Sequence, residues 1–369
     1  MEHVQRDNKT EGRCLMVCNR KNGMETAPRV SIIILNWNGW KDTIECLESV
    51  YQITYPNYDV IVADNGSENE SIEKIKEYAE GKLEVTSKFF KYSGENKPFC
   101  YIEYTREETE AGSGKEGEIN DLPSWKKLII IKNGKNYGFA EGNNIAIRYA
   151  LKTLNPKYVL LLNNDTVVDK RFLNELVNVA ESDRRIGFVG PKTYYYDHHG
   201  RTDVINFAGG RLVMWKGKSI HIGLNEIDRG QHDGIADVDY VEGSCLLTRR
   251  EILESIGLLD PTYFLYWEET DWCMRVHKAG LRLVYAPKAE IWHKVAASSK
   301  PKSNPVIEYY CTRNRSRFIM KNGSTLDKTM YSMYLFGYLS ISKIFASLLF
   351  YRDLERCRFV LKGLLDGFR

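Results

Sequence analysis

The chain has 369 residues, a hydrophobic content of 43% and a formal net charge of +3. This length fits one large domain or two, and the nearly balanced charge argues against nucleic acid as the main partner. The eight cysteines show no zinc-finger spacing, so we interpret them as reduced thiols of a cytoplasmic protein. Residues 1–27 are polar and of mixed charge, without the pattern of a signal peptide, and we expect a disordered tail.

The N-terminal part of the chain predicts alternating strands and helices. Residues 30–35 form an apolar run typical of a buried strand, and a loop containing Asn36 and Asn38 leads from it into an amphipathic helix. A second strand follows and ends in Asp64 and Asn65. Short connections of this kind predict parallel strands joined by right-handed crossovers.

Residues 81–127 interrupt this alternation. They are rich in glutamate, lysine, glycine and aromatic residues, and we expect an insertion that contains a short hairpin. A third strand at 127–132 then leads through a glycine-rich loop into another helix. Further along, the sequence predicts a strand at 187–192 and β-hairpins within residues 193–240.

The chain is organised around residues 158–166, which read YVLLLNNDT. The apolar run predicts a strand buried on both faces, and it ends in Asn163, Asn164 and Asp165. Ligands of open parallel sheets bind beyond the carboxyl ends of the strands. One carboxylate together with substrate phosphates is a usual Mg²⁺ arrangement, so Asp165 is a candidate metal ligand. A polar turn that leads into the next helix explains the same residues without a ligand.

Two other polar residues follow strand-like segments. Asp64 can accept hydrogen bonds from a base or a ribose, or it can stabilise its own loop as an Asx-turn. His293 is a second candidate metal ligand through an imidazole nitrogen, although a lone histidine is commonly structural.

An acidic cluster begins a predicted helix near residue 268. Asp271 and Arg275 are four residues apart and can pair, and Glu268 shares their face. Glu269 is rotated by about 100° and can face a cleft. Neighbouring aromatic residues lower the local polarity, which raises the pKa of a carboxyl group towards the strength useful for a general base. A solvated acidic helix start, favoured by the helix dipole, accounts for the same spacing.

Together the motifs of residues 29–320 resemble family 2 glycosyltransferases of the GT-A fold, especially the rhamnosyltransferase-like branch. The resemblance rests on VSIIILNWNG, IVADNGS, NYGFAEGNN, VLLLNNDT, VEGSCLLTRREIL, FLYWEETDWCMRV, His293 and Arg313-Asn314-Arg315, in this order. It implies an α/β fold with a Rossmann-like, mostly parallel sheet flanked by helices and a helical C-terminal extension. It also implies a nucleotide-sugar donor, a divalent Mg²⁺ or Mn²⁺ ion, and inverting transfer to a glycan or lipid-linked acceptor in surface polysaccharide synthesis.

The resemblance assigns roles to individual residues. Asp64 matches the nucleotide-binding aspartate, and Asn163 to Asp165 occupy the DXD motif with asparagine in place of its first aspartate. Asp165 then holds the metal, His293 matches a histidine that helps to hold the metal or the diphosphate, and Glu269 matches the general base of the "ED" motif. The remaining donor-binding candidates are Asn36, Asn38, Asn65, Asn163 and Asn164, and the candidates for acceptor binding or loop structure are Gly243, Trp267 and Glu268.

We expect a catalytic domain over residues 28–322 and a helical extension over 323–369. Residues 330–351 are apolar and aromatic, but a lysine and several serines interrupt them, which disfavours a membrane span. Residues 352–369 are basic and amphipathic. The extension therefore either lies at a membrane interface, at the inner face of the cell membrane, or packs on the catalytic domain.

Three other functions fit parts of the pattern. A sugar-1-phosphate nucleotidylyltransferase needs a glycine-rich loop with arginine and lysine after the first strand, and a dinucleotide-dependent oxidoreductase needs GxGxxG; both features are absent from the sequence. A catalytically silent carbohydrate-binding relative is the remaining alternative. The presence of Asp165, Glu269 and His293 argues against it, and an assay of donor hydrolysis separates the two.

Overall fold

The computed structural model describes residues 27–112, 114–295, 305–339 and 354–368. Its main sheet has the strand order β11-β13-β7-β12-β5-β1-β2-β4-β3, with β6 beside β13 and β8 beside β7. The strands are β1 (Val30–Asn36), β2 (Tyr58–Asp64), β3 (Cys100–Thr105), β4 (Lys127–Lys132), β5 (Tyr158–Asn163), β6 (Thr166–Val168), β7 (Ile186–Tyr195), β8 (Ile205–Phe207), β9 (Gly210–Val213), β10 (Lys218–His221), β11 (Ala236–Asp237), β12 (Cys245–Arg249) and β13 (Arg282–His293).

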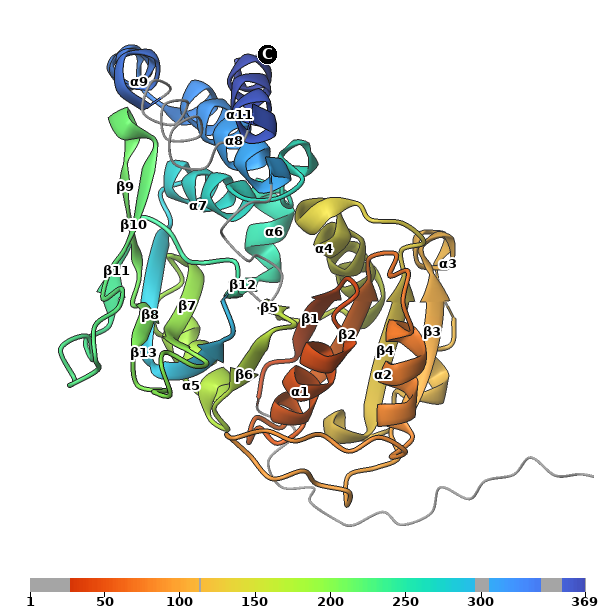
Figure 1. Ribbon diagram of the computed structural model, residues 1–369. Helices are drawn as coiled ribbons and strands as arrows, with labels where there is room; N and C mark the ends of the chain where they lie inside the picture. The colour runs from red at the N-terminus through yellow and green to blue at the C-terminus, as the bar shows by residue number, and fades with distance from the viewer. Residues whose placement is uncertain (1–26, 113, 296–304, 340–353, 369) are drawn as a thin grey trace, which may run out of the picture.

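Helices cover both faces of this sheet (Figure 1). Those on one face are α1 (Trp40–Val50), α2 (Ser71–Ala79) and α5 (Phe172–Ser182), and those on the other are α4 (Gly138–Tyr149), α6 (Arg250–Ile256) and α7 (Glu268–Lys278). The short α3 (Arg106–Ala111) follows β3. Because the central strands are apolar on both sides, each face of the sheet builds its own core.

The register of the central strands brings their polar ends to one level. β1 pairs in parallel with both β2 and β5, so that Asn36 lies opposite Asp64 and Leu35 lies opposite Asn163. The predicted parallel arrangement of these strands is therefore confirmed. Their carboxyl ends form the sheet edge at which a ligand is expected.

The C-terminal helices form a third small core at one end of the sheet (Figure 1). They are α8 (Pro305–Asn322), α9 (Thr325–Tyr334) with the π-helical turn η6 (Leu335–Leu339), and α11 (Leu354–Gly367). Phe318 of α8, Tyr331 of α9 and Val360 of α11 meet in this core. No helix within the described ranges is long and apolar enough to cross a membrane.

Two glycines allow α11 to lie directly against the backbone of α8. A Cβ atom at Gly363 would stand 2.8 Å from the carbonyl oxygen of Tyr309, and one at Gly367 would stand 2.9 Å from that of Arg313. Real Cβ atoms essentially never come so close to other heavy atoms. We call this contact the glycine seam; it fixes the spacing of the two helices.

The region 81–127 differs from the expected insertion with a hairpin. β3 pairs in parallel with β4 and forms an edge strand of the main sheet. The expected hairpin in residues 193–240 is confirmed, because β9 and β10 pair antiparallel. The strand predicted at 187–192 is also confirmed and is the middle of the longer β7.

Candidate active site

The carboxyl ends of β1 and β2 are joined by a buried network around Asp64. Asn36 Nδ2 and Ser67 Oγ both donate to Asp64 Oδ2, at 2.7 and 2.6 Å, and the Ser67 amide donates to Oδ1 at 2.9 Å. Thr43 Oγ1 donates to Asn36 Oδ1 at 2.8 Å. Asp64 thus stabilises its own loop, and any ligand that reaches it meets a carboxylate already fixed in direction.

Asn65 and Asn38 serve the loops around this network. Asn65 is buried, and its Nδ2 donates to Asn136 Oδ1 and to the Gly138 carbonyl, each at 3.0 Å. It therefore holds the loop that leads into α4. Asn38 has a positive φ of 55°, and its Oδ1 accepts a hydrogen bond from the Glu68 amide at 2.9 Å. Both residues position the loops that surround the sheet edge.

The turn between β5 and β6 holds Asn163, Asn164 and Asp165. The Asn163 amide donates to the Ser244 carbonyl at 2.9 Å, and Asn164 Nδ2 donates to Thr43 Oγ1 at 3.0 Å. These bonds tie the turn to neighbouring elements on both sides. They leave the Asp165 side chain to a different partner.

That partner is His293, which lies 3.1 Å from Asp165 between Nε2 and Oδ1. His293 is the last residue of β13, and β13 pairs antiparallel with β6, which places His293 opposite Thr166. Burial disfavours the charged form of the imidazole, but the Asp165 carboxylate outweighs it and raises the pKa of His293 to about 9. For Asp165, burial is likewise outweighed by His293, and its pKa is lowered. At neutral pH the two residues form an ion pair.

The pair fits part of a divalent metal site. A carboxylate oxygen and an imidazole nitrogen converge on one position, and His293 Nδ1 is buried with no hydrogen-bond partner among the described residues. Over the same residues, no third histidine, cysteine, aspartate or glutamate joins them. Mg²⁺ and Mn²⁺ accept few protein ligands when substrate phosphates and water complete the coordination shell. The donor set fits such an ion, whose binding would displace the proton that His293 shares with Asp165.

The acidic residues at the start of α7 differ in their surroundings. Asp271 is fully buried and bonded to Arg275 at 3.2 Å and to Lys321 at 2.9 Å, which confirms the predicted pair with Arg275. Glu268 is buried, and its Oε2 has no hydrogen-bond partner in the described part of the chain. Burial, followed by the neighbouring Glu269, holds the pKa of Glu268 well above its usual range.

Glu269 faces the loop that precedes β12. A Cβ atom at Gly243 would lie 3.5 Å from the Cβ and Cγ atoms of Glu269, which is ordinary van der Waals contact and shows that the two residues are neighbours. Burial, with a further contribution from the charge of Glu242, raises the pKa of Glu269 to about 7. Trp267, by contrast, packs its ring on Phe318 of α8 with 5.1 Å between centroids. This contact fixes the loop before α7.

Residues 242–244 connect the two halves of the site. Ser244 accepts the amide of Asn163, Gly243 contacts Glu269, and the charge of Glu242 raises the pKa values of both Glu269 and His293. The sequence marked this loop only by its small residues. Thr43 was not singled out, since its importance depends on which strand ends come together.

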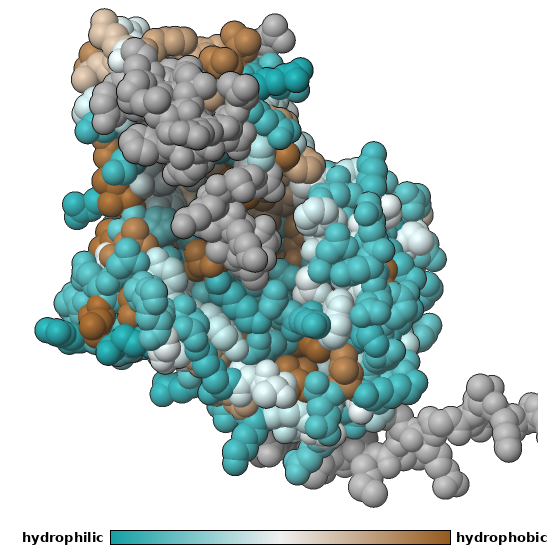
Figure 2. Space-filling view, viewed as in Figure 1, coloured by the Kyte–Doolittle hydropathy of each residue, from teal (hydrophilic) through white to brown (hydrophobic). Residues whose placement is uncertain are grey.

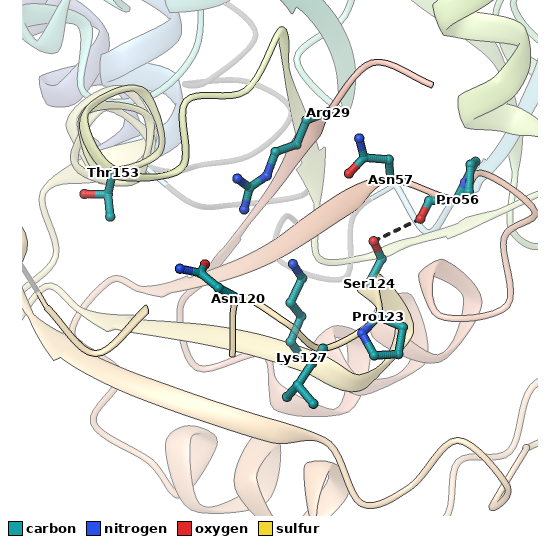
Figure 3. A pocket seen from close by; sticks show the side chains of 9 residues that line it. Arg29, Pro56, Asn57, Asn120, Pro123, Ser124, Lys127 and Thr153 are labelled. Carbon is teal, nitrogen blue, oxygen red and sulfur yellow. Dashed lines mark hydrogen bonds between the residues drawn. The ribbon is translucent and has the colours of Figure 1, made fainter. Parts of the chain in front are cut away.

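A cavity of about 370 Å³ lies at the opposite edge of the sheet (Figure 3). Arg29, just before β1, and Lys127, at the start of β4, line it, and both pair with the buried carboxylate of Asp59. The cavity is therefore at the amino ends of the strands. It is separate from the residues described above.

Comparison with known proteins identifies the family. The model of "Glycosyltransferase like family 2" matches residues 121–314, and that of "Glycosyl transferase family 2" matches residues 31–96. The chain belongs to glycosyltransferase family 2. The two matched segments contain Asp64, Asp165, Glu269 and His293.

Two curated relatives agree with the rhamnosyltransferase-like branch. This glycosyltransferase is 24% identical to the low-salt glycan biosynthesis hexosyltransferase Agl10 of Haloferax volcanii, over 62% of the chain and 73% of the relative. It is also 24% identical to the dTDP-rhamnosyl transferase RfbF of Shigella flexneri, over 54% of the chain and 66% of the relative. The resemblance inferred from the sequence motifs is confirmed.

Solved structures confirm the GT-A fold. GalNAc-T7 with UDP, GalNAc and Mn²⁺ superposes with a TM-score of 0.57 at 17% identity, over 92% of this chain and 55% of that one. Residues 1–349 of S. aureus TarS in complex with UDP-GlcNAc superpose with a TM-score of 0.52 at 14% identity, over 92% and 80%. At these identities the likeness concerns the fold of the glycosyltransferase.

Proposed function

We propose that this chain is an inverting glycosyltransferase that moves a sugar from a nucleotide-diphosphate donor to a hydroxyl of a glycan or lipid-linked acceptor in surface polysaccharide or glycoconjugate synthesis. The observation that carries the proposal is that a candidate metal site and a candidate general base lie on the two sides of residues 242–244. On one side lie Asp165 and His293, which suit a metal and a diphosphate. On the other lies Glu269, a carboxylate whose pKa of about 7 suits a general base.

The proposed reaction is a single displacement. Glu269 accepts the proton of the acceptor hydroxyl while the oxygen of that hydroxyl attacks the anomeric carbon from the face opposite the diphosphate. The bond from that carbon to the diphosphate oxygen breaks, so the anomeric configuration inverts. Asp165 and His293 would hold Mg²⁺ or Mn²⁺, which stabilises the negative charge of the leaving diphosphate. Asn36, Ser67 and Asp64 would orient the nucleoside end of the donor.

We propose a deoxythymidine or uridine diphosphate sugar as the donor. The similarity to a dTDP-rhamnosyl transferase supports this choice. A panel of dTDP-, UDP- and GDP-sugars, read by release of the nucleoside diphosphate with Mg²⁺, with Mn²⁺ and with a chelator, tests it. We expect metal-dependent release from a dTDP- or UDP-sugar. Tight donor binding without release, under every condition and with every acceptor, would instead favour the catalytically silent relative.

We further propose that the C-terminal helices contact a membrane surface. Exposed apolar residues recur at helical spacing along α9 and α11, and the rings of Phe336 and Phe368 stack at 5.7 Å and join the two rows. Figure 2 shows apolar residues gathered at this end of the molecule. We call this set the apolar strip; it consists of Leu326, Met330, Met333, Phe336, Leu361, Leu365 and Phe368.

Charge favours a lipid surface as the occupant of the apolar strip. Residues 323–369 contain seven lysines and arginines against four aspartates and glutamates. A basic, apolar segment of this composition is attracted to anionic headgroups and buries its apolar side chains among them. The proposed location is the cytoplasm, at the inner face of the cell membrane, where a lipid-linked acceptor is within reach.

Co-sedimentation with phosphatidylcholine and phosphatidylglycerol vesicles tests this contact. We expect the wild type to sediment with anionic vesicles and the double variant Met333→Glu, Leu365→Glu to stay in solution. The matched control is Leu224→Glu, Ile235→Glu, which changes two exposed apolar residues outside the strip. Equal partitioning of all three proteins overturns the contact, and self-association detected by analytical ultracentrifugation would assign the strip to a second copy.

A further inference from the structure

The segment before the candidate base has an unusual backbone. Phe264, Tyr266 and Trp267 have positive φ angles of 65°, 69° and 74°. Bulky residues rarely adopt this conformation, and it persists only where the surroundings impose it. Trp267 is the residue immediately before α7. The conformation of this segment therefore sets where the first turn of α7, with Glu269, begins.

Asn314 of α8 holds this segment in its conformation through hydrogen bonds to the backbone. Its side chain is fully buried, and Nδ2 donates to the carbonyl oxygens of Tyr263, Leu265 and Tyr266, each at 2.8 Å. A carboxamide nitrogen carries two protons, so the three carbonyls share them. No apolar or acidic side chain can supply these bonds.

Two further contacts hold the segment at its ends. Arg313 donates to the carbonyl oxygens of Thr262 and Tyr263, at 2.8 and 2.7 Å. On the opposite side, the Phe139 amide of α4 donates to the Phe264 carbonyl at 2.6 Å. The segment is thus held between α8 and α4, and Asn314 supplies the central hydrogen bonds.

We propose that Asn314 is a positioning residue for Glu269: it fixes residues 263–267 and thereby the direction from which the base approaches the acceptor hydroxyl. The role of Glu269 as base rests on the proposed function. Misplacement of a reacting group by about 1 Å can cost about 10²-fold in rate. Asn314 reaches no acidic side chain of the site and acts only through the backbone.

The rest of α7 has its own anchors. Trp272 and Val276 are fully buried in the core, and Asp271 is bonded to Arg275 and Lys321. Loss of the Asn314 bonds should therefore loosen residues 263–269 and leave the body of the helix in place. This separates a positioning role from a general role in stability.

The test variant is Asn314→Leu, which has a similar size, adds no charge and cannot donate. We expect kcat to fall by about 10²-fold with donor affinity unchanged. Loosening should also admit water to Glu269, so the acidic limb of the pH profile should move to lower pH. The groups that face Glu269 are Glu268, Glu242, Tyr240 and Cys273, and none of them is altered by this variant.

Ser316→Ala is the matched control. Ser316 lies on the same helix, is fully buried and bonds to Thr312 and Tyr331, away from the segment. We expect it to lower the melting temperature without changing kcat or the pH profile. If Asn314→Leu does not fold, Arg313→Gln carries the test, with a drop in kcat of about tenfold in the same direction. An unchanged kcat and acidic limb in the folded variant overturns the proposal, as does an equal loss in Ser316→Ala.

Hydrogen exchange supplies a readout that does not need activity. We expect Asn314→Leu to lose amide protection in residues 263–269 alone, and Ser316→Ala to keep it. If the wild type transfers no sugar, the proposed function fails while this pattern still reports the hydrogen bonds of Asn314. Unchanged exchange in Asn314→Leu overturns the positioning role even when the enzyme is active.

Discussion

Three carboxylates within four residues of α7 have different surroundings and, we propose, different roles. Asp271 is bonded to Arg275, Lys321 and the Tyr263 hydroxyl, and these bonds tie the helix to its neighbours. Glu269 faces Gly243 and has no cationic partner in the described residues. Burial without a compensating charge is what raises the pKa of a carboxyl group and makes it a stronger base.

Glu269→Gln keeps the size of the side chain but cannot accept a proton. We expect kcat to fall by about 10²–10⁴-fold while donor affinity stays nearly unchanged, because the donor is proposed to bind at Asp64 and Asp165. Steady-state kinetics with a nucleotide titration checks this. Glu268→Gln should lose less activity, and Asp271→Asn should act mainly on stability. Near wild-type turnover in Glu269→Gln would move the base assignment to one of these neighbours.

The raised pKa of Glu269 gives activity and stability opposite pH dependences. As the pH falls below about 7, Glu269 is protonated and kcat/KM should decrease. The folded-state pKa lies above the unfolded value of about 4.3, so the folded protein binds more protons and loses stability as the pH rises through this interval. Glu269→Gln should therefore melt at a higher temperature than the wild type at pH 8, and the difference should vanish near pH 4. A difference independent of pH would contradict the assignment.

Asp165→Ala removes the carboxylate of the proposed metal pair. We expect Mn²⁺-dependent binding of a nucleoside diphosphate to disappear, because a single neutral imidazole is a poor site for a hard cation. Calorimetric titration with and without Mn²⁺ measures this, and circular dichroism should show an intact fold. Asp169→Ala, four residues further along and outside the site, is the control. Unchanged Mn²⁺-dependent affinity would remove Asp165 from the metal site.

At the scale of single residues, the sequence identified side chains but not their partners. Asp165 and His293 were both named as candidates, and the structure brings them within 3.1 Å. The bonds of Ser67 to Asp64 are local and fit the Asx-turn that the sequence offered. The bond of Asn36 to Asp64 could not be foreseen, because it depends on the register of β1 against β2. Burial of a carboxyl group such as Glu268 likewise follows from packing that no local pattern contains.

At the scale of elements, long apolar runs were predictable and short strands were not. The sequence suggested a helix soon after Asp165, whereas the three-residue strand β6 comes first. Three residues are too few to show an alternating pattern, and the partner of β6 is β13, more than a hundred residues later. β3 was misread as part of a hairpin for a different reason: its partner β4 is parallel and is separated from it by helical and irregular chain.

The glycine seam offers a test at this scale. Gly367→Val would place side-chain atoms within 2.7 Å of Ser316 Cβ and 2.9 Å of the Arg313 carbonyl oxygen. We expect a loss of stability of about 1–3 kcal/mol, the usual cost of overpacking, and faster hydrogen exchange in α11. Gly234→Ala, at a position with open space, is the control. Unchanged stability would show that α11 does not depend on this contact.

At the scale of the whole molecule, the order of strands and helices was foreseen and their assembly was not. Both sequence motifs and structure place the donor-binding candidates at one edge of the sheet. Nothing in the sequence indicated that α8 packs behind the segment before α7. That contact joins residues 48 to 51 positions apart, and its three hydrogen bonds end on backbone carbonyls, which carry no sequence signature.

The glycine seam also fixes the distance between the proposed membrane contact and Glu269. The apolar strip lies on α9 and α11, α11 lies directly on α8, and α8 holds the segment that aims Glu269. With the strip resting on a bilayer, the base would stand at one height above the lipid headgroups. The enzyme would then select, in an acceptor anchored in the same bilayer, the hydroxyl at a fixed distance from the lipid anchor. A hydroxyl one sugar nearer to the bilayer or farther from it would not reach the base.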